Sequence, residues 1–212
     1  MDKPVFKQKR KRNRRKNQIG NASLYRPIPT NMKVVLRGRT YDTGSSAAAP
    51  VYSRYGLVEF LQRGGSYSDT LFQLYRHAKV HHSKITLRLV NMSSEPLILA
   101  VAPLPADWNT GSPTLGEILD VPRCVRKTTG GSGGMDKVVI TNSAYAKDLL
   151  GAEYVTARYQ MDSTQAASST PIISNEPTWN VVVSSFNAAT AISYRLEVEL
   201  EWLADFYDLD SS

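Results

Sequence analysis

The sequence predicts an all-β domain, most readily a jelly roll, behind a positively charged N-terminal arm. Several segments show the two-residue alternation of a half-buried strand, whereas helical spacing is confined to three short segments. This mixture is typical of a sandwich or barrel of antiparallel strands with short helices in its connections. The connections at 42–50, 105–113, 130–134 and 163–177 exceed tight hairpin turns. Long loops of this kind favour a jelly roll over an up-and-down barrel.

The first sixteen residues hold most of the chain's net charge. They contain nine basic residues against one acid, Asp2, which gives a net charge of +8. The remaining residues carry 17 basic and 18 acidic side chains, a net charge of −1. The basic residues of this arm are Lys3, Lys7, Lys9, Arg10, Lys11, Arg12, Arg14, Arg15 and Lys16.

The arm is predicted to be disordered until an anion binds it. Residues 7–16 read KQKRKRNRRK, and their like charges repel while few apolar groups are present to offset the entropy lost on folding. DNA, RNA, an acidic membrane surface, a heparin-like polymer and a nuclear import receptor can each bind such a run. Because Phe6 is the only aromatic residue of the arm, recognition should depend on charge and not on base stacking, and should therefore be sensitive to salt. The plain alternative is a solvated run without a partner, but nine basic residues in sixteen exceed ordinary solubility needs.

The domain organisation follows from this charge boundary. We expect a basic arm at 1–16, a linker at 17–31 that contains Gly20, Pro27 and Pro29, and one folded domain at 32–212. One cysteine in 212 residues excludes an internal disulfide framework and fits a reducing compartment. The N-terminus has no apolar stretch after its charges, so we expect neither a secretory signal nor a membrane span.

The first predicted strands lie between residues 32 and 103. Met32–Arg37 is a β-branched run that Gly38 is expected to stop. His82–Asn91 alternates apolar and polar residues more clearly, and a turn at 93–96 leads into the apolar run Leu97–Pro103. These last two runs are predicted to form a hairpin.

Two further strands are predicted near the C-terminus. Thr178–Phe186 is rich in valine, and Ala191–Leu203 alternates apolar and mostly polar residues. A helix would spread Glu197, Glu199 and Glu201 around its circumference, whereas a strand places all three on one face. The long second segment is therefore predicted to be a strand.

Helical signals are few and short. Asp69–His77 has an N-cap residue and apolar residues at helical spacing, and Thr114–Leu119 is long enough for one turn. Ser143–Leu150 is followed by Gly151, a residue that commonly ends helices. We therefore expect two or three short helices in the loops.

A family resemblance rests on four sequence motifs: LFQLYRHAKVHHSKITLRLVN at 71–91, PRCVRKTTGG at 122–131, AYAKDLLG at 144–151 and WLADFYD at 202–208. Together with the arm, the proline-bearing linker and the β domain, they resemble capsid proteins of small icosahedral viruses, most of all those of circular Rep-encoding single-stranded DNA viruses. The resemblance covers most of the chain in the order of its segments and about a third of it in recognisable sequence motifs. Coat proteins of small plus-strand RNA viruses share the same plan.

The resemblance implies a single eight-stranded antiparallel jelly roll at 32–212, many copies of which tile a closed shell with their arms inside. It also implies viral nucleic acid as the partner of the arm, with single-stranded DNA favoured over RNA, and copies of the chain itself as the other partner. A nuclear import receptor is a further expected binding partner of the arm, and no membrane partner is expected. The protein would then reside in the virion, and in the host nucleus or cytoplasm during assembly.

No catalytic constellation is evident in the sequence, and no cofactor is expected. His77 and His81 have the spacing of the HExxH zinc motif, but Ala78 stands where the glutamate should be. These histidines and His82 are expected to pack where a short helix gives way to a strand. Cys124 lies among basic residues, yet no histidine is near it in the sequence, which favours a buried or incidental thiol.

The weak metal candidates are Asp205, Asp208 and Asp210. Their spacing matches no calcium loop, and such a tail is more often solvated or paired with basic groups. Trp108, Trp179 and Trp202 are expected to be core or subunit-contact anchors.

Two other classes of protein stay open. A ribosomal or chromatin-type protein could carry the same arm, although a body at −1 lacks the basic face expected of it. A carbohydrate-binding jelly roll, or an enzyme on that fold, would need ligands or paired carboxylates around a cavity.

Overall fold

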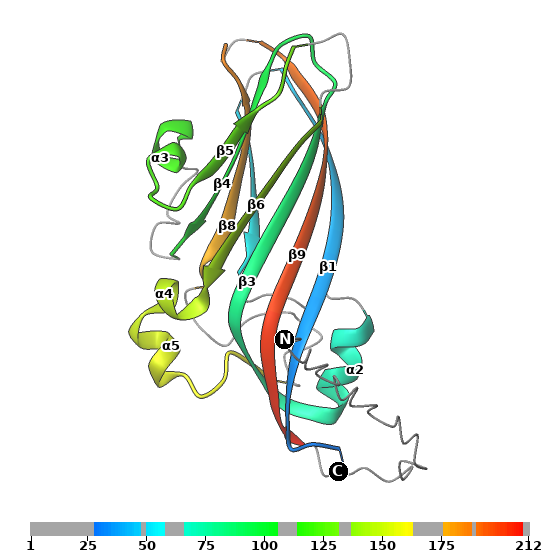
Figure 1. Ribbon diagram of the computed structural model, residues 1–212, viewed down its shortest axis with the longest axis vertical. Helices are drawn as coiled ribbons and strands as arrows, with labels where there is room; N and C mark the ends of the chain where they lie inside the picture. Colours follow the sequence, from blue (N-terminus) through cyan, green and yellow to red (C-terminus); the bar gives the residue numbers. More distant parts are fainter. Residues whose placement is uncertain are drawn as a thin grey trace, which may run out of the picture.

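Two antiparallel sheets pack face to face in the computed structural model (Figure 1). The structure describes residues 28–47, 50–57, 66–105, 114–131, 137–162, 176–187 and 190–209. The first sheet has the order β1-β9-β3-β6, and the short β7 pairs with the start of β3. The second sheet has the order β2-β8-β4-β5. The strands of the first sheet are β1 (Asn31–Ser46), β9 (Ile192–Leu209), β3 (Tyr75–Asn91), β6 (Lys137–Tyr145) and β7 (Met161–Asp162). Those of the second sheet are β2 (Val51–Gly56), β8 (Thr178–Ser185), β4 (Leu97–Leu104) and β5 (Val125–Thr128).

This strand order is that of a jelly roll. Leaving aside the two-residue β7, eight strands divide evenly between the sheets, and the chain changes sheet at each connection except the one between β4 and β5. Apart from β4 and β5, neighbours within a sheet are therefore not consecutive in sequence, as is the case when Greek keys are wrapped into a double sheet. The prediction of an eight-stranded antiparallel jelly roll is confirmed.

The core lies between the sheets and is filled from alternate positions of the long strands. In β3 the side chains of Ile85, Leu87 and Leu89 are fully buried, while their neighbours along the strand are partly exposed. Trp179 of β8 and Trp202 of β9 are the largest fully buried side chains, which confirms them as core anchors. Trp108 lies outside the described residues.

The two sheets differ in what covers their outer sides. The helix α3 (Leu115–Leu119) covers part of the second sheet, where Ala100, Ala102 and Val182 form a second buried cluster with Ile118. Strands β4 and β8 are consequently buried on both faces; β4 is an unbroken apolar run, and β8 contains the run Val181–Val183 between polar residues that are also buried. The outer side of the first sheet is instead polar and partly exposed along every long strand.

Strand β1 corrects the prediction that Gly38 ends it. Gly38 pairs with Leu200 in mid-strand, on the inward-facing side where a small residue fits between the sheets. The strand continues to Ser46, so most of the predicted loop at 42–50 is strand. A glycine stops a strand only when tertiary pairing does not continue through it.

The predicted hairpin of 82–91 and 97–103 is wrong. Strand β3 pairs with β9 and β6, whereas β4 pairs with β8 and β5 in the other sheet. The connection between them crosses the end of the sandwich, where the Asn91 side chain donates hydrogen bonds to Glu95 O (2.8 Å), Thr129 Oγ1 (3.0 Å) and Gly130 O (3.0 Å). These bonds give the backbone carbonyls of Glu95 and Gly130 a hydrogen-bond donor, which in a hairpin the paired backbone would have supplied.

The helices are placed close to the predictions, with shifted ends. The helix α2 (Ser66–Leu74) ends three residues before His77, because the next residues already pair in β3. The prediction at 114–119 is confirmed by α3, which Thr114 caps through a capping box with Glu117. In the predicted segment 143–150, α4 (Ala146–Leu150) is helical and residues 143–145 belong to β6.

Several elements had no sequence prediction. These are the strands β2, β5, β6 and β7, together with the helix α5 (Ala152–Thr156). Among the described residues, no helix is both long and apolar enough to cross a membrane.

Candidate functional site

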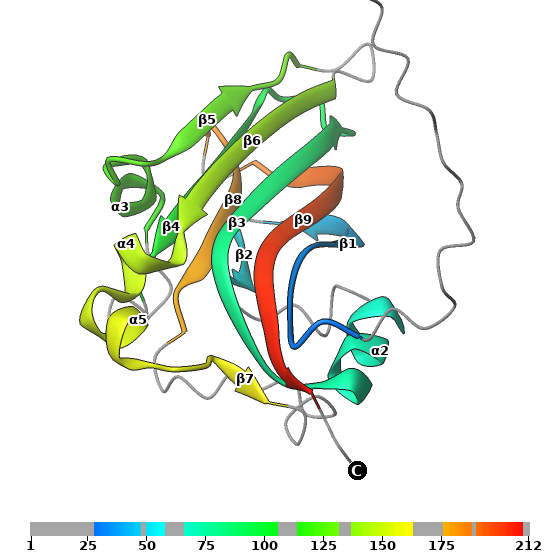
Figure 2. The same cartoon turned by 60° about the horizontal axis from the view of Figure 1, so that its bottom comes forward.

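Figure 2 shows the β1-β9-β3-β6 sheet in front of the second sheet. The outward-facing side chains of this first sheet are mostly polar and partly exposed, and they are here called the outer face. Antiparallel register places one residue from each strand side by side, so the outer face consists of rows that cross the sheet. In the order β1, β9, β3, β6, five of these rows are Thr43–Arg195–Val90–Lys137, Tyr41–Glu197–Arg88–Val139, Arg39–Glu199–Thr86–Thr141, Arg37–Glu201–Lys84–Ser143 and Val35–Leu203–His82–Tyr145.

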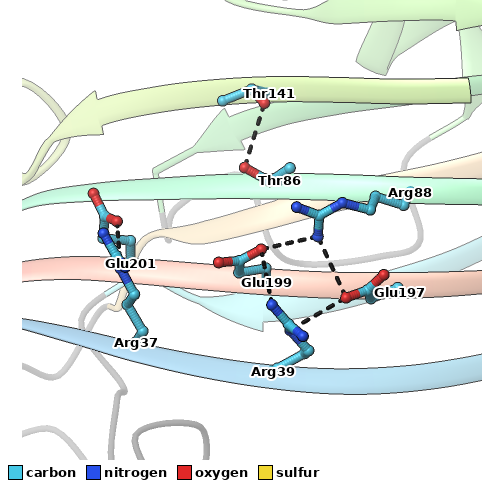
Figure 3. Close-up of polar contacts among 8 residues, drawn as sticks. All are labelled: Arg37, Arg39, Thr86, Arg88, Thr141, Glu197, Glu199 and Glu201. Atoms are coloured by element: carbon cyan, nitrogen blue, oxygen red, sulfur yellow. Dashed lines mark hydrogen bonds and ion pairs between the residues drawn. The ribbon is translucent and has the colours of Figure 1, made fainter.

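Three of these rows contain a ladder of ion pairs centred on β9 (Figure 3). Arg37 Nε lies 2.8 Å from Glu201 Oε2, and Arg39 contacts both Glu197 (3.2 Å) and Glu199 (3.5 Å). Arg88 reaches the same two glutamates from β3, at 3.3 and 2.8 Å. The prediction that the three glutamates share one face of a strand is confirmed, and two of them are held from both sides.

The ladder perturbs the glutamate at its centre. The hydrogen bond from Arg88 is the main cause that holds the pKa of Glu199 below its ordinary value. Burial opposes this shift, and the charges of Arg88, Arg39 and Arg37 add to it. Each pair is partly exposed, so screening by solvent keeps its contribution to stability small. The ladder ties β1 to β3 across β9 on the side of the sheet that has no apolar core.

The end of the outer face near the start of β1 holds a second polar cluster, on the α5 side. His81 Nε2 lies 2.7 Å from Asp205 Oδ2, and His81 Nδ1 lies 2.7 Å from the hydroxyl of Tyr154. Lys79 Nζ donates to Tyr154 O and Ala157 O, both at 2.7 Å. These bonds fasten the segment 152–162 to β3, where β7 adds two backbone pairs.

The candidate metal residues are part of this arrangement. Asp205 pairs with His81, and Asp208 lies 3.3 Å from Arg158 and 3.8 Å from His77 Nε2. Asp210 lies outside the described residues. Within the described ranges, no three His, Cys, Asp or Glu side chains are grouped so that they could hold a metal ion.

Cys124 packs partly buried against the cluster beneath α3. Burial raises the pKa of its thiol, and the nearby charge of Arg126 opposes this shift. The neighbouring Arg123 is engaged elsewhere, because it pairs with Asp148 at 2.9 Å. The environment therefore disfavours a reactive thiolate.

The nine basic residues of the arm, Lys3 to Lys16, all lie outside the described residues. The described part of the chain contains fifteen Lys and Arg against fourteen Asp and Glu. Sequence reasoning identified the glutamates of the outer face from their period, but it missed Arg37, Arg39 and Arg88. Their partners lie more than one hundred residues away, and no local pattern signals such pairs.

No family model and no curated protein matches this chain. Among solved structures, similar chains include that of Cocksfoot mottle virus, with 14% identity over 100% of this chain and 96% of that chain and a TM-score of 0.49. A structure of 60-mer BFDV Capsid Protein has 11% identity over 87% of this chain and 98% of that chain, with a TM-score of 0.49. A Desmodium yellow mottle tymovirus chain has 19% identity over 90% of this chain and 98% of that chain, with a TM-score of 0.42. The strand order given above, and not these similarities, defines the fold.

Proposed function

We propose that this chain is the coat protein of a small icosahedral virus, which assembles with copies of itself into a closed shell and packages the genome through its N-terminal arm. The observation that carries the proposal is the contrast between an arm at +8 and a jelly-roll body at −1. Jelly rolls are a recurrent capsid architecture. A body of nearly zero net charge can pack against copies of itself without strong repulsion.

Repetition accounts for the plain composition of the arm. About 60 copies, the simplest icosahedral number, would bring about 480 positive charges inside the shell and neutralise a similar number of phosphates. Many weak tethered contacts give firm packaging without reading of bases. The arm residues that carry this role are Lys3, Lys7, Lys9, Arg10, Lys11, Arg12, Arg14, Arg15 and Lys16.

The finer assignment rests on the sequence motifs given above. They favour a circular Rep-encoding single-stranded DNA virus over a plus-strand RNA virus. Under this proposal the arm also serves as a nuclear import signal, and the protein resides in the virion and, during assembly, in the host nucleus or cytoplasm.

Light scattering and electron microscopy of the purified full chain test the shell. We expect particles of about a megadalton or larger, containing nucleic acid that survives external nuclease. Digestion of the extracted nucleic acid with DNase or RNase then identifies its kind. A monodisperse monomer in the presence of nucleic acid would contradict the capsid proposal and favour a ribosomal or chromatin-type binder.

A charge variant of the full chain tests whether the arm packages the nucleic acid. In an arm-neutral variant, the nine basic residues at 3–16 are replaced by glutamine, and we expect shells that lack nucleic acid. The matched control replaces only the five lysines of the arm with arginine, which keeps its charge, and it should package normally. Packaging by the arm-neutral variant at the level of the unmodified protein would show that the arm is not the packaging element.

A further inference from the structure

We infer that the body carries its own contact for a single-stranded nucleic acid, a groove at the far end of the outer face. In it Arg195 and Lys137 bind backbone phosphates and Tyr41 stacks on a base. The inference rests on the proposed function in its choice of nucleic acid as the anionic partner. It adds an ordered contact on the folded domain to the arm.

Charge distinguishes this end of the face from the rest. Arg195 and Lys137 belong to the row Thr43–Arg195–Val90–Lys137, which contains no acid. Both side chains are exposed, and neither has a hydrogen bond or ion pair with any other described residue. In the ladder rows, by contrast, β9 supplies a glutamate to each row. Of these outer-face rows, this is the one in which two unpaired cations lie together with no acid in the row.

Two acids, Asp42 and Glu197, also line the groove, and each already has a partner on the folded chain. Glu197 is shared between Arg39 and Arg88, at 3.2 and 3.3 Å. Asp42 lies on the inward side of β1, where its carboxylate accepts a hydrogen bond from the hydroxyl of the buried Tyr55. An incoming anion thus meets two unpaired cations and one glutamate that already has two partners.

The surface is hollowed at this position. A groove of about 230 Å³ runs across the sheet and is lined by Tyr41, Thr43, Arg88, Lys137 and Arg195, among others. A second hollow of about 300 Å³ adjoins it at Thr43 and Arg195 and adds the hydroxyl-bearing Ser45 and Ser193. Arg195 therefore lies between two hollows that offer hydrogen-bonding groups for a sugar–phosphate backbone.

The spacing of the groups suits a strand of nucleotides better than a single small anion. Lys137 on β6 and Arg195 on β9 are separated by one intervening strand, so their backbones are about 10 Å apart. They would contact different phosphates of one strand. The Tyr41 side chain lines the same groove from β1 and is 69% exposed, which leaves its ring available for base stacking.

The groove lies at the end of β1 opposite the one where the described chain begins. The described chain begins near the other end of β1, where Asn31 pairs with Tyr207, and Thr43 lies twelve residues further along the strand. At about 3.3 Å per residue this distance is about 40 Å. The two contacts can therefore be tested independently in the same chain.

Salt-dependent binding of a fluorescein-labelled oligothymidylate to the full chain, purified free of nucleic acid, provides the test. The groove variant Arg195→Gln/Lys137→Gln is compared with Arg126→Gln/Lys147→Gln, which removes the same two charge types from exposed positions outside the groove. Loss of two phosphate contacts should reduce the slope of log affinity against log salt by about 1.4, while the control keeps the slope of the unmodified protein. Equal slopes for the groove and control variants would overturn the inference.

The same measurement in the arm-neutral background separates the two proposals. If the groove variant still reduces the residual binding there, the groove stands whatever the arm contributes. If the arm-neutral change lowers binding while the groove variant behaves as its control, the proposed function stands and the groove does not.

Photocrosslinking locates the contact. An oligonucleotide carrying 5-iodo-deoxyuridine should crosslink to the β1 peptide that contains Tyr41, and Tyr41→Ala should abolish this crosslink. Absence of any crosslink in that peptide would overturn the assignment. Loss of assembly by the groove variant with unchanged oligonucleotide binding would show that the groove is a contact between copies, which would also overturn it.

Discussion

The indole N–H of Trp179 donates a hydrogen bond of 3.0 Å to the hydroxyl of Ser83, and this bond joins the two sheets inside the core. Both residues are fully buried. Trp179 belongs to β8 of the second sheet and Ser83 to β3 of the first. The polar atom of the large indole is therefore satisfied only when the two sheets are aligned as observed.

Replacement of Ser83 with alanine should destabilise the domain by about 1–3 kcal/mol, because it leaves a buried indole N–H without a partner. Urea unfolding followed by tryptophan fluorescence measures this effect. The control is Ser143→Ala, an exposed serine of the neighbouring strand β6, which should change the free energy of unfolding by less than about 0.5 kcal/mol. Equal effects of the two changes would indicate that the cross-sheet bond does not contribute to stability.

Gly44→Ala should destabilise the domain by about 1–3 kcal/mol, because the added Cβ would overlap the ring of the buried Tyr194. Gly116→Ala is the matched change. The nearest atom to its Cβ is Thr114 Oγ1 at 4.0 Å, and alanine favours the helix α3 by up to about 1 kcal/mol. Thermal unfolding should therefore shift in opposite directions, and a lowered midpoint for both variants would contradict this account.

The Arg–Glu ladder predicts a defined pH dependence. The pKa of Glu199 is lowered in the folded protein, chiefly by the Arg88 hydrogen bond. A carboxyl with a depressed folded pKa stabilises the protein fully above its ordinary value of 4.5, and this contribution is lost as the pH falls through the lower folded value. Glu199→Gln should therefore be less stable than the unmodified protein by about 1 kcal/mol at pH 7, and the difference should shrink as the pH falls below 4.5 and through the lower folded pKa of Glu199.

Urea unfolding between pH 3 and 7 checks this prediction. Glu95→Gln serves as the control, because Glu95 is exposed and its side chain has no ion pair with another described residue. Its stability difference should stay small at every pH. A Glu199→Gln difference that does not change with pH would show that the ladder does not titrate with folding.

Lys79→Met should loosen the segment 152–162 without unfolding the sheets. The ammonium of Lys79 donates to Tyr154 O and Ala157 O at the C-terminal end of α5, where backbone carbonyls lack helical partners. Hydrogen–deuterium exchange of this segment should become at least about tenfold faster, since two charged hydrogen bonds are lost and each is worth about 1.5 kcal/mol or more. Lys84→Met on the same strand removes a lysine without a partner among the described residues, and it should leave exchange of this segment unchanged.

The long strands could be predicted from sequence because their two-residue alternation is strong. Ile85, Leu87 and Leu89 alternate with polar residues in β3, and the same period in β9 placed Glu197 and Glu201 on one outward face. The short strands β2 and β5 lack this signal. Residues of β5 are mostly exposed, and Tyr55 is the one buried residue of β2, so neither strand has the alternation from which a strand can be predicted.

The pairing of the strands and the partners of the ion pairs could not be predicted from the sequence for a related reason. Asn91 and Leu97 are close in sequence, but a cross-over connection places them in different sheets. Arg88 finds Glu199 from a distance of 111 residues along the chain. Such relationships depend on strand order, which the periodicity of single segments does not encode.

The central place of β9 between β1 and β3 has a consequence for synthesis on the ribosome. Strand β1 cannot pair at Ser46 until Ile192 has been synthesised, and β3 cannot pair with β9 at Asn91 until Tyr194 has been synthesised. Until residues 192–209 emerge, β1 and β3 lack the strand that lies between them, and their apolar sides and backbone edges are open to other nascent chains. The first sheet can therefore be completed only after residues 192–209 have left the ribosome, and the chain has to be protected from association with other chains until then.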